Sequence, residues 1–216
     1  MYLSTFAVVS DHGIPLTLPE TSVLMGENKV ELIVIGGSAG SFPVLLHLIK
    51  ALPENFSVPV LIVVHRQRNV LSEFTKIVAE ANKNKRILEP DDKALIEKPC
   101  IYIAPQNYHT LIEKDRSFSL DYSEAIKFSR PSIDVTFESA ARVYKNNLLS
   151  ILLSGANNDG TDGIKTVIKN GGSAIVQDPS TAEFPAMPRS ALAAVPDVAV
   201  LNFFRISNYI NSLNSL

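Results

Sequence analysis

The chain has 216 residues, a formal net charge of −2 and an apolar fraction of 46%. Its length suits one globular domain with a short extension, and the small net charge without a long basic run argues against nucleic acid as a partner. No apolar stretch approaches the ~20 residues that span a bilayer, which argues against membrane insertion, and the N-terminus lacks a secretory-signal pattern. A single cysteine, Cys100, excludes an internal disulfide and indicates a reducing compartment, so we expect a cytoplasmic protein.

The first part of the chain differs from the rest. Residues 1–28 are interrupted by prolines and glycines and have no strong periodicity. From residue 29 onward apolar runs and helical patterns alternate, with no internal repeat and no linker. We therefore expect an N-terminal extension at 1–28 and one domain at 29–216.

The most informative stretch lies at residues 31–40. An apolar run at 32–35 ends in Gly36-Gly37-Ser38-Ala39-Gly40, and after Pro43 apolar residues recur at helical spacing. This pattern predicts a buried strand, a tight turn and a helix. Such a turn lies at the carboxyl edge of a sheet, beside the positive end of a helix, where α/β folds bind ligands.

The glycine turn has three interpretations. Gly36-x-Ser38-x-Gly40 matches the G-x-S-x-G nucleophile elbow, which exposes a serine hydroxyl. The same glycines could cradle a phosphate, although the spacing does not fit G-x-G-x-x-G and no P-loop lysine follows. In the third interpretation Ser38 only shapes the turn. This stretch alone leaves all three open.

Strands and helices alternate along the rest of the chain. We expect further strands over 58–64, 86–88, 99–104, 148–153, 173–176 and 197–201, and helices over 72–81, 132–144, from Gly160 to about 170, 187–194 and 203–213. Residues 110–113 and 117–121 flank a polar turn and predict a hairpin, which would add an antiparallel portion to the sheet. The alternation predicts an α/β fold with a mostly parallel sheet covered on both faces.

Three predicted strands end close to residues that a nucleophilic hydrolase needs, namely Ser38, His65 and Asp159. Because the carboxyl ends of parallel strands meet at one edge, these side chains could converge there. A serine hydroxyl needs a base, histidine has a suitable pKa, and a carboxylate can orient the imidazole. The chain order Ser-His-Asp differs from the Ser-Asp-His order of α/β-hydrolases.

Other residues compete for these roles. His109 also follows a strand and is a rival base, Asp162 is a rival acid, and His47 falls on a partly core-facing helix position that suggests a structural role. Arg66 and Arg68 could meet a cofactor 2′-phosphate, which keeps a dinucleotide site as an alternative. With four histidines and no Cys-His cluster at ligand spacing, we expect no metal site.

Several sequence blocks occur together in a recognisable order. They are IGGSAG at 35–40, VVH at 63–65, YIAP at 102–105 followed by His109, RPSID at 130–134, LSGANNDG at 153–160, and QD at 177–178 with AMP at 186–188. Over about residues 30–202 the chain resembles the catalytic domain of the bacterial chemotaxis protein-glutamate methylesterases, the CheB family. The resemblance implies a doubly wound, Rossmann-like three-layer fold, mostly parallel with an antiparallel hairpin.

The resemblance also implies an activity. A Ser38-His65-Asp159 triad would hydrolyse glutamyl methyl esters on chemoreceptor-type proteins, and could deamidate glutamine, without a cofactor. The implied partners are a methylated chemoreceptor and a separate response regulator. The remaining candidates are the backbone N–H groups near Ala39 and Ala156 for the oxyanion, and Arg130 and Met187 for the substrate.

The sequence departs from the family pattern at several positions. Ala39 stands where threonine is usual, Ala156 where methionine is usual, and Ser41 and Ala186 where glycines are usual. The 28 residues before the domain are too few for the receiver domain that the family often carries, so we expect no control by an attached receiver. The departures at Ala39 and Ala156 keep a non-catalytic binding module on the same fold as an alternative, and a nucleotide-binding domain is a third interpretation.

Overall fold

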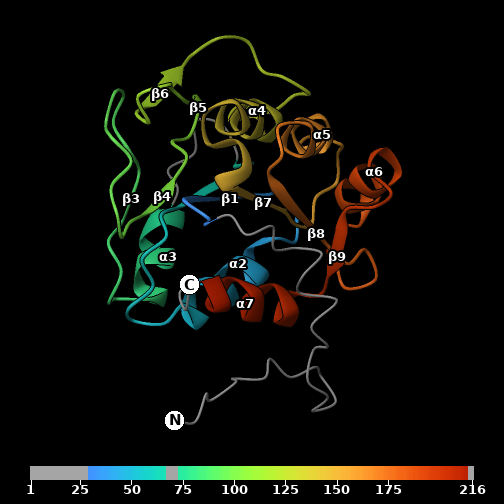
Figure 1. Ribbon diagram of the computed structural model, residues 1–216, viewed down its shortest axis with the longest axis horizontal. Helices are drawn as coiled ribbons and strands as arrows, with labels where there is room; N and C mark the ends of the chain where they lie inside the picture. Colours follow the sequence, from blue (N-terminus) through green and yellow to red (C-terminus); the bar gives the residue numbers. More distant parts are fainter. Residues whose placement is uncertain (1–28, 67–72, 214–216) are drawn as a thin grey trace.

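The structure is a computed structural model that describes residues 29–66 and 73–213 (Figure 1). The predicted extension at 1–28, Arg68 and Ser72, where a predicted helix begins, lie outside the described residues. Within the described ranges, seven parallel strands form one sheet in the order β3-β4-β2-β1-β7-β8-β9. The strands are β1 Leu32–Gly37, β2 Val60–Val64, β3 Ile87–Leu88, β4 Ile101–Ile103, β7 Leu148–Leu152, β8 Ser173–Gln177 and β9 Ala199–Leu201. The predicted α/β class with a mainly parallel sheet is confirmed.

The strand order changes direction at the centre of the sheet. From β1 the chain builds outward on one side through β2, and it later returns to pair β7 with the other side of β1. At the carboxyl end of these strands Gly37 is opposite Val64, and Gly36 is opposite Leu152. This is the switch point at which doubly wound sheets leave a crevice for ligands.

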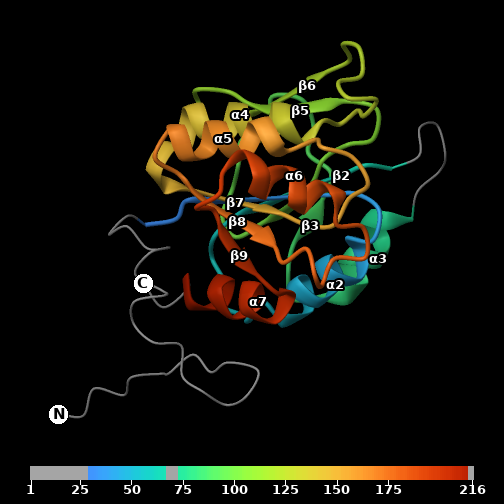
Figure 2. The same cartoon turned by 90° about the vertical axis from the view of Figure 1, so that its right-hand side faces the viewer.

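Helices cover both faces of the sheet, as Figures 1 and 2 show from two directions. The helices are α2 Phe42–Ala51, α3 Phe74–Ala81, α4 Ile133–Tyr144, α5 Thr161–Lys169, α6 Ala186–Ala194 and α7 Phe203–Ser212. Alternate residues of β1 point to opposite faces: Leu32 and Val34 pack with α4, α5 and α6, and Ile33 and Ile35 pack with α2, α3 and α7. The centre of β1 is therefore buried on both sides, which explains its uninterrupted apolar run.

The predicted hairpin forms from β5 (His109–Ile112) and β6 (Phe118–Asp121), but it is a separate two-stranded sheet. The expectation that it would extend the main sheet was wrong. Side chains of α4 bind the backbone of β5: Thr136 Oγ1 donates to the Thr110 carbonyl, and the Ile112 N–H donates to Ser139 Oγ. The hairpin is thus attached to a helix, with Ile112 buried in the shared core.

Helix α4 approaches the end of β1 unusually closely. A Cβ atom at Gly36 would lie 2.4 Å from Ile133 Cγ2 and 3.1 Å from Phe137 Cζ, so only glycine leaves room for the helix. Because Ile133 is the first residue of α4, this contact sets the N-terminus of the helix directly over the carboxyl end of β1. The glycine therefore positions a helix end, with its free N–H groups, at the switch point.

Candidate active site

Ser38 lies in the turn between β1 and α2, and both of its backbone polar groups are hydrogen-bonded. Its N–H donates to the Ser154 carbonyl at 2.9 Å, and its carbonyl accepts from Ser41 Oγ at 2.6 Å. Ser41 is fully buried. These bonds fix the turn while the side chain of Ser38 stays half-buried at the sheet edge.

His65 follows β2 directly and lies between the other two predicted residues. Its backbone N–H donates to the Gly37 carbonyl, which links it to the end of β1. On the imidazole, Nδ1 is 3.2 Å from Ser38 Oγ and Nε2 is 2.9 Å from Asp159 Oδ2. The histidine side chain is 12% exposed, so one edge of the ring remains open to solvent or a substrate.

The carboxylate of Asp159 is fully buried at the N-terminus of α4. One oxygen accepts from the Ile133 N–H at 2.7 Å as well as from His65, and the other accepts from the Asp134 N–H and Ser132 Oγ, each at 3.0 Å. The helix end thus supplies donors and a positive field to a buried negative charge.

This environment controls the ionisation of Asp159. Burial opposes the charged form, but hydrogen bonds from His65 and from the backbone N–H groups of Asp134 and Ile133 outweigh it and lower the pKa of Asp159 to about 2. The carboxylate is therefore an acceptor at neutral pH, and Nε2 of His65 carries the proton that it receives. Nδ1 then presents a lone pair to the Ser38 hydroxyl, the arrangement that general-base activation of a nucleophile requires.

A family model described as CheB methylesterase matches residues 33–210. The chain belongs to the CheB methylesterase family.

Two relatives within the family differ in length. A Leptospira interrogans protein, provisionally named protein-glutamate methylesterase/protein-glutamine glutaminase, is 45% identical over 177 residues, which are 82% of this chain and 91% of that protein. The Thermotoga maritima protein-glutamate methylesterase/protein-glutamine glutaminase is 32% identical over 168 residues, which are 75% of this chain and 48% of the Thermotoga protein. The crystal structure of the Thermotoga maritima CheB methylesterase catalytic domain matches with a TM-score of 0.80 at 28% identity, covering 86% of this chain and 99% of that domain.

The remaining predicted site residues of this CheB-family chain differ in their surroundings. Ala39 and Ala156 are exposed, and within the described residues no acceptor is bonded to the backbone N–H of either. Arg130 Nη1 donates to the carbonyls of Tyr122 and Ser123, and its guanidinium lies 3.9 Å from the centre of the Tyr122 ring. The side chain of Arg130 is therefore engaged in holding the 122–130 segment.

Met187 has a supporting position. It is fully buried, and a Cβ at Gly155 would lie 2.4 Å from its Cε atom. Its N–H donates to the Gly155 carbonyl. Met187 therefore packs behind Gly155 and supports the loop that carries Ala156, and its direct contact with a substrate stays a prediction.

The rival residues have other partners. His109 is buried, its Nδ1 accepts from the Ser132 N–H, and its Nε2 donates to the Glu124 carbonyl. Asp162 pairs with Lys127 and Lys165 on the surface. Neither bonds to Ser38 within the described residues, so His109 helps to hold the start of α4 and Asp162 lies outside the site.

The glycine turn leaves no room for a phosphate at its glycines. Added Cβ atoms would meet the Ile133 side chain at Gly36, Ser41 at Gly37, and Glu183 at Gly40. A dinucleotide cradle needs open glycine faces, so the packing argues against that alternative. Arg66, its proposed phosphate ligand, instead pairs with Glu89 and donates to the Ala104 carbonyl.

Sequence reasoning missed several residues of the site. Ser129 Oγ lies 3.2 Å from His65 Nδ1, and Ser132 caps α4 while bonding Asp159. Ser154 Oγ donates to the Ala39 carbonyl and accepts from the Phe184 N–H. The Pro-Ser pair at a helix start was a usable signal for Ser132, but nothing local marks the other two.

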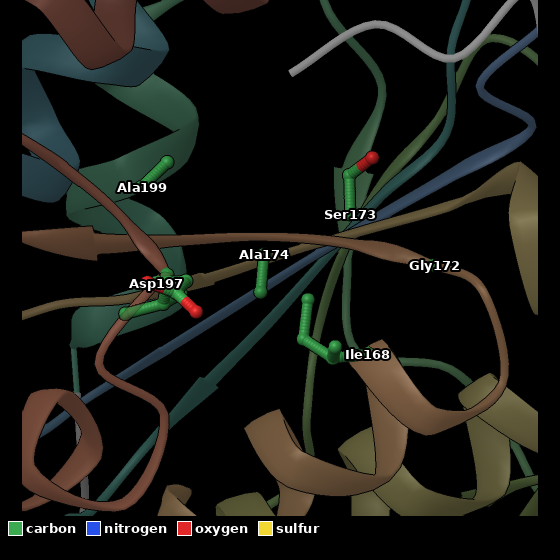
Figure 3. Close-up of a pocket in the computed structure, with 7 residues that line it drawn as sticks. Ile168, Gly172, Ser173, Ala174, Asp197 and Ala199 are labelled. Carbon is green, nitrogen blue, oxygen red and sulfur yellow. The ribbon is translucent and has the colours of Figure 1, made fainter. Parts of the chain in front are cut away.

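A pocket lies at the opposite edge of the sheet. Figure 3 shows it between Ile168, the start of β8 at Ser173, and the segment from Asp197 to Ala199 that leads into β9. It is lined by small and apolar side chains with one carboxylate, that of Asp197. Within the described ranges no helix is long and apolar enough to cross a membrane, and no cluster of three His, Cys, Asp or Glu could hold a metal ion.

Proposed function

We propose that this chain hydrolyses glutamyl methyl esters on a protein and releases methanol, with Ser38, His65 and Asp159 as its catalytic triad. The observation that carries the proposal is the continuous hydrogen-bonded series from Ser38 Oγ through the His65 ring to the buried Asp159 carboxylate. The names of the relatives support the substrate class, and they also support glutamine deamidation as a second reaction.

In the first half of the reaction, Ser38 Oγ attacks the ester carbonyl while its proton passes to His65 Nδ1. Asp159, which is ionised, stabilises the imidazolium through the Nε2 proton. Collapse of the tetrahedral intermediate breaks the bond to the methoxy group, and Nδ1 returns its proton to the leaving oxygen. Methanol departs, and the glutamyl acyl group remains esterified to Ser38.

The second half consumes one water molecule. Water attacks the acyl carbon and gives a proton to Nδ1, which returns it to Ser38 Oγ as the acyl bond breaks. The products are a glutamate carboxylic acid and the original enzyme. An amide substrate follows the same steps with ammonia as the leaving group.

The backbone N–H groups of Ala39 and Ala156 are our proposed oxyanion donors. Ala39 follows the nucleophile directly, and its carbonyl is held by Ser154 Oγ, so the orientation of the turn is fixed. Ala156 lies in the loop after β7 that Met187 supports through Gly155. Each such donor is commonly worth about 3–4 kcal/mol of transition-state stabilisation.

The proposed partner is a chemoreceptor-type protein that carries methylated glutamates, and the proposed regulator is a separate response regulator. We also keep the cytoplasm as the proposed compartment. The lone cysteine of the sequence, Cys100, is a buried free thiol, and this use of cysteine supports a reducing compartment.

The test uses two probes on the purified chain: a chemoreceptor preparation with radiolabelled glutamyl methyl esters, and p-nitrophenyl acetate. We expect methanol release from the receptor and nitrophenol release from the ester. Ser38→Ala and His65→Ala should each lower kcat by about 10⁴-fold or more, because triad members act as a unit. Thermal unfolding should show that both variants remain folded.

A histidine outside the site provides the matched control. The His47 ring packs edge-on against Phe203 and Phe204 of α7, away from the triad, so His47→Ala should keep its activity. Hydrolysis of the nitrophenyl ester without methanol release would contradict the receptor substrate. If the folded chain hydrolyses neither probe, it is the non-catalytic binding module.

A further inference from the structure

Two serine hydroxyls lie at the same nitrogen of His65. Ser38 Oγ and Ser129 Oγ are each 3.2 Å from Nδ1. The two serines come from unrelated parts of the fold: Ser38 follows β1, and Ser129 follows the hairpin and precedes α4. The proposed mechanism uses the hydroxyl of Ser38 as the nucleophile and gives the hydroxyl of Ser129 no role.

The protonation state of the ring limits what both hydroxyls can do. Ionised Asp159 holds the proton on Nε2, so neutral His65 has a single in-plane lone pair at Nδ1. One lone pair accepts one well-aligned hydrogen bond, and the two hydroxyls therefore compete for it. While Ser38 keeps its proton, Ser129 is a rival donor at the base.

The backbone of Ser129 is fixed independently of His65. Its N–H and carbonyl both pair with Ile126, closing a two-residue turn at Lys127 and Phe128. The Lys127 ammonium reaches inward to Asp134 on α4 and Asp162 on α5. The hydroxyl of Ser129 is thus carried by a turn that is anchored to the same helices as the acid of the triad.

We propose that Ser129 is a positioning residue for the second half of the reaction. This inference rests on the proposed function, because it requires Ser38 to become acylated. Once Ser38 Oγ is esterified it has no proton to donate, and Ser129 becomes the remaining hydroxyl donor that holds Nδ1 toward the acyl carbon. When water transfers a proton to Nδ1, the Ser129 oxygen can accept the new Nδ1–H. Ser129 forms and breaks no covalent bond.

The consequence is an asymmetry between the two half-reactions. In acylation Ser38 itself donates to Nδ1 and orients the ring, so Ser129 is redundant and its removal should leave the acylation rate nearly unchanged. In deacylation Ser38 has no proton to donate, and Ser129 is the hydroxyl that keeps the ring oriented until water takes its place at Nδ1, so its removal should slow hydrolysis of the acyl-enzyme. A residue that merely supported the fold of the loop would slow both steps together.

The experiment measures the two steps separately. The chain is acylated with p-nitrophenyl trimethylacetate, a bulky ester that deacylates slowly, and nitrophenol release gives the acylation rate. Excess reagent is removed by rapid gel filtration, and intact mass spectrometry then follows loss of the acyl adduct. We expect Ser129→Ala to acylate within about twofold of the unmodified chain and to lose the adduct about tenfold more slowly, the effect of one hydrogen bond. Ser129→Thr, which keeps a hydroxyl, should restore the decay.

A second serine of the same segment provides the control. The Ser123 hydroxyl donates to the Asp121 carboxylate and not to His65, so Ser123→Ala should match the unmodified chain in both steps. Equal adduct decay in Ser129→Ala and the unmodified chain would overturn the inference, and so would a parallel loss of both rates. If the unmodified chain forms no adduct at all, the proposed function itself fails, and the two failures are distinguishable.

Discussion

Asp159 and Asp134 cap two neighbouring helices reciprocally. Asp159 lies two residues before α5 but accepts from the Asp134 N–H at the start of α4, while the Asp134 carboxylate accepts from the Gly163 N–H in the first turn of α5. The two helices are also close enough that a Cβ at Gly163 would lie 2.6 Å from Phe137 Cβ. The proposed catalytic acid is thus part of a reciprocal helix cap as well as the partner of His65.

Because of this dual role, we expect Asp159→Asn to lower both the catalytic rate and the stability of the fold. An amide cannot accept at every position of the carboxylate, so its NH₂ group would face a backbone N–H or His65. We expect kcat to fall by about 10³–10⁴-fold, as when a neutral amide replaces a triad carboxylate, and the free energy of unfolding to fall by about 1–3 kcal/mol. Ester hydrolysis and urea unfolding measure the two effects, and unchanged stability would show that the cap contributes little.

The low pKa of Asp159 predicts how stability depends on pH. Because the folded-state pKa is about 2, below the ordinary 3.8, the ionised group stabilises the fold above about pH 4, and this contribution is lost as the pH falls toward 2. The lost stabilisation is on the order of 2 kcal/mol. Urea unfolding between pH 6 and pH 2.5 should show a flatter profile for Asp159→Asn than for the unmodified chain.

Asp134 acts with the opposite sign in the same pH range. Burial raises the pKa of Asp134, and the nearby Asp159 carboxylate also raises it, against the opposing effects of Lys127 and the Gly163 N–H. Its protonation therefore favours the folded state as the pH falls. Asp134→Asn should consequently lose stability more steeply than the unmodified chain on acidification, and a shallower profile would contradict this assignment.

Lys127 supplies the cation that compensates Asp134. Its Nζ lies 2.6 Å from Asp134 Oδ2 and 2.9 Å from Asp162 Oδ2, and Asp134 is nearly buried. Lys127→Met keeps an unbranched apolar side chain but leaves that carboxylate without its cation, so we expect a loss of about 1–3 kcal/mol in urea unfolding. The matched variant Lys165→Met removes only an exposed pair with Asp162 and should cost less than about 0.5 kcal/mol. Equal losses would mean that the pairing with Asp134 adds nothing.

The close approach of α4 to β1 can be tested at Gly36. A methyl group there would overlap Ile133, so Gly36→Ala should destabilise the protein by about 1–3 kcal/mol and lower kcat by moving the helix end that holds Asp159. Ile133→Ala removes the side-chain atoms that the new methyl group would overlap. In a double-mutant cycle, the free energy of unfolding of the double variant should therefore fall by less than the sum of the two single losses. Gly171→Ala, which has a positive φ but space around its Cβ, should cost about 1 kcal/mol and leave activity intact.

The sequence was a good guide wherever the signal was local. The apolar run before Ser38, the strand that ends at Val64 and the helix that starts after Pro131 all form close to their predicted bounds, because burial and turn chemistry are read from neighbouring residues. The predicted positions of Ser38, His65 and Asp159 at strand ends also led to three side chains that the fold brings together.

What could not be predicted depends on contacts between distant segments. The attachment of the hairpin to α4 through Thr136 needs the helix to be placed first. Asp159 accepts hydrogen bonds from backbone N–H groups of α4 that lie 25 and 26 positions away in the sequence. The helical and strand periodicities of the sequence give no information about such a contact. Ser129 had no signal at all, since a serine beside Arg130 in a turn is unremarkable until His65 is folded against it.

The orientation of the His65 ring has a further chemical consequence. Because Nε2 faces the buried carboxylate, the nitrogen that meets the nucleophile and any bound reagent is Nδ1. A substrate-like halomethyl ketone that first captures Ser38 would therefore alkylate the imidazole at the nitrogen nearer its own backbone. The ring nitrogen that carries the methylene carbon of the reagent would then show which side of the imidazole faces the nucleophile in the active enzyme.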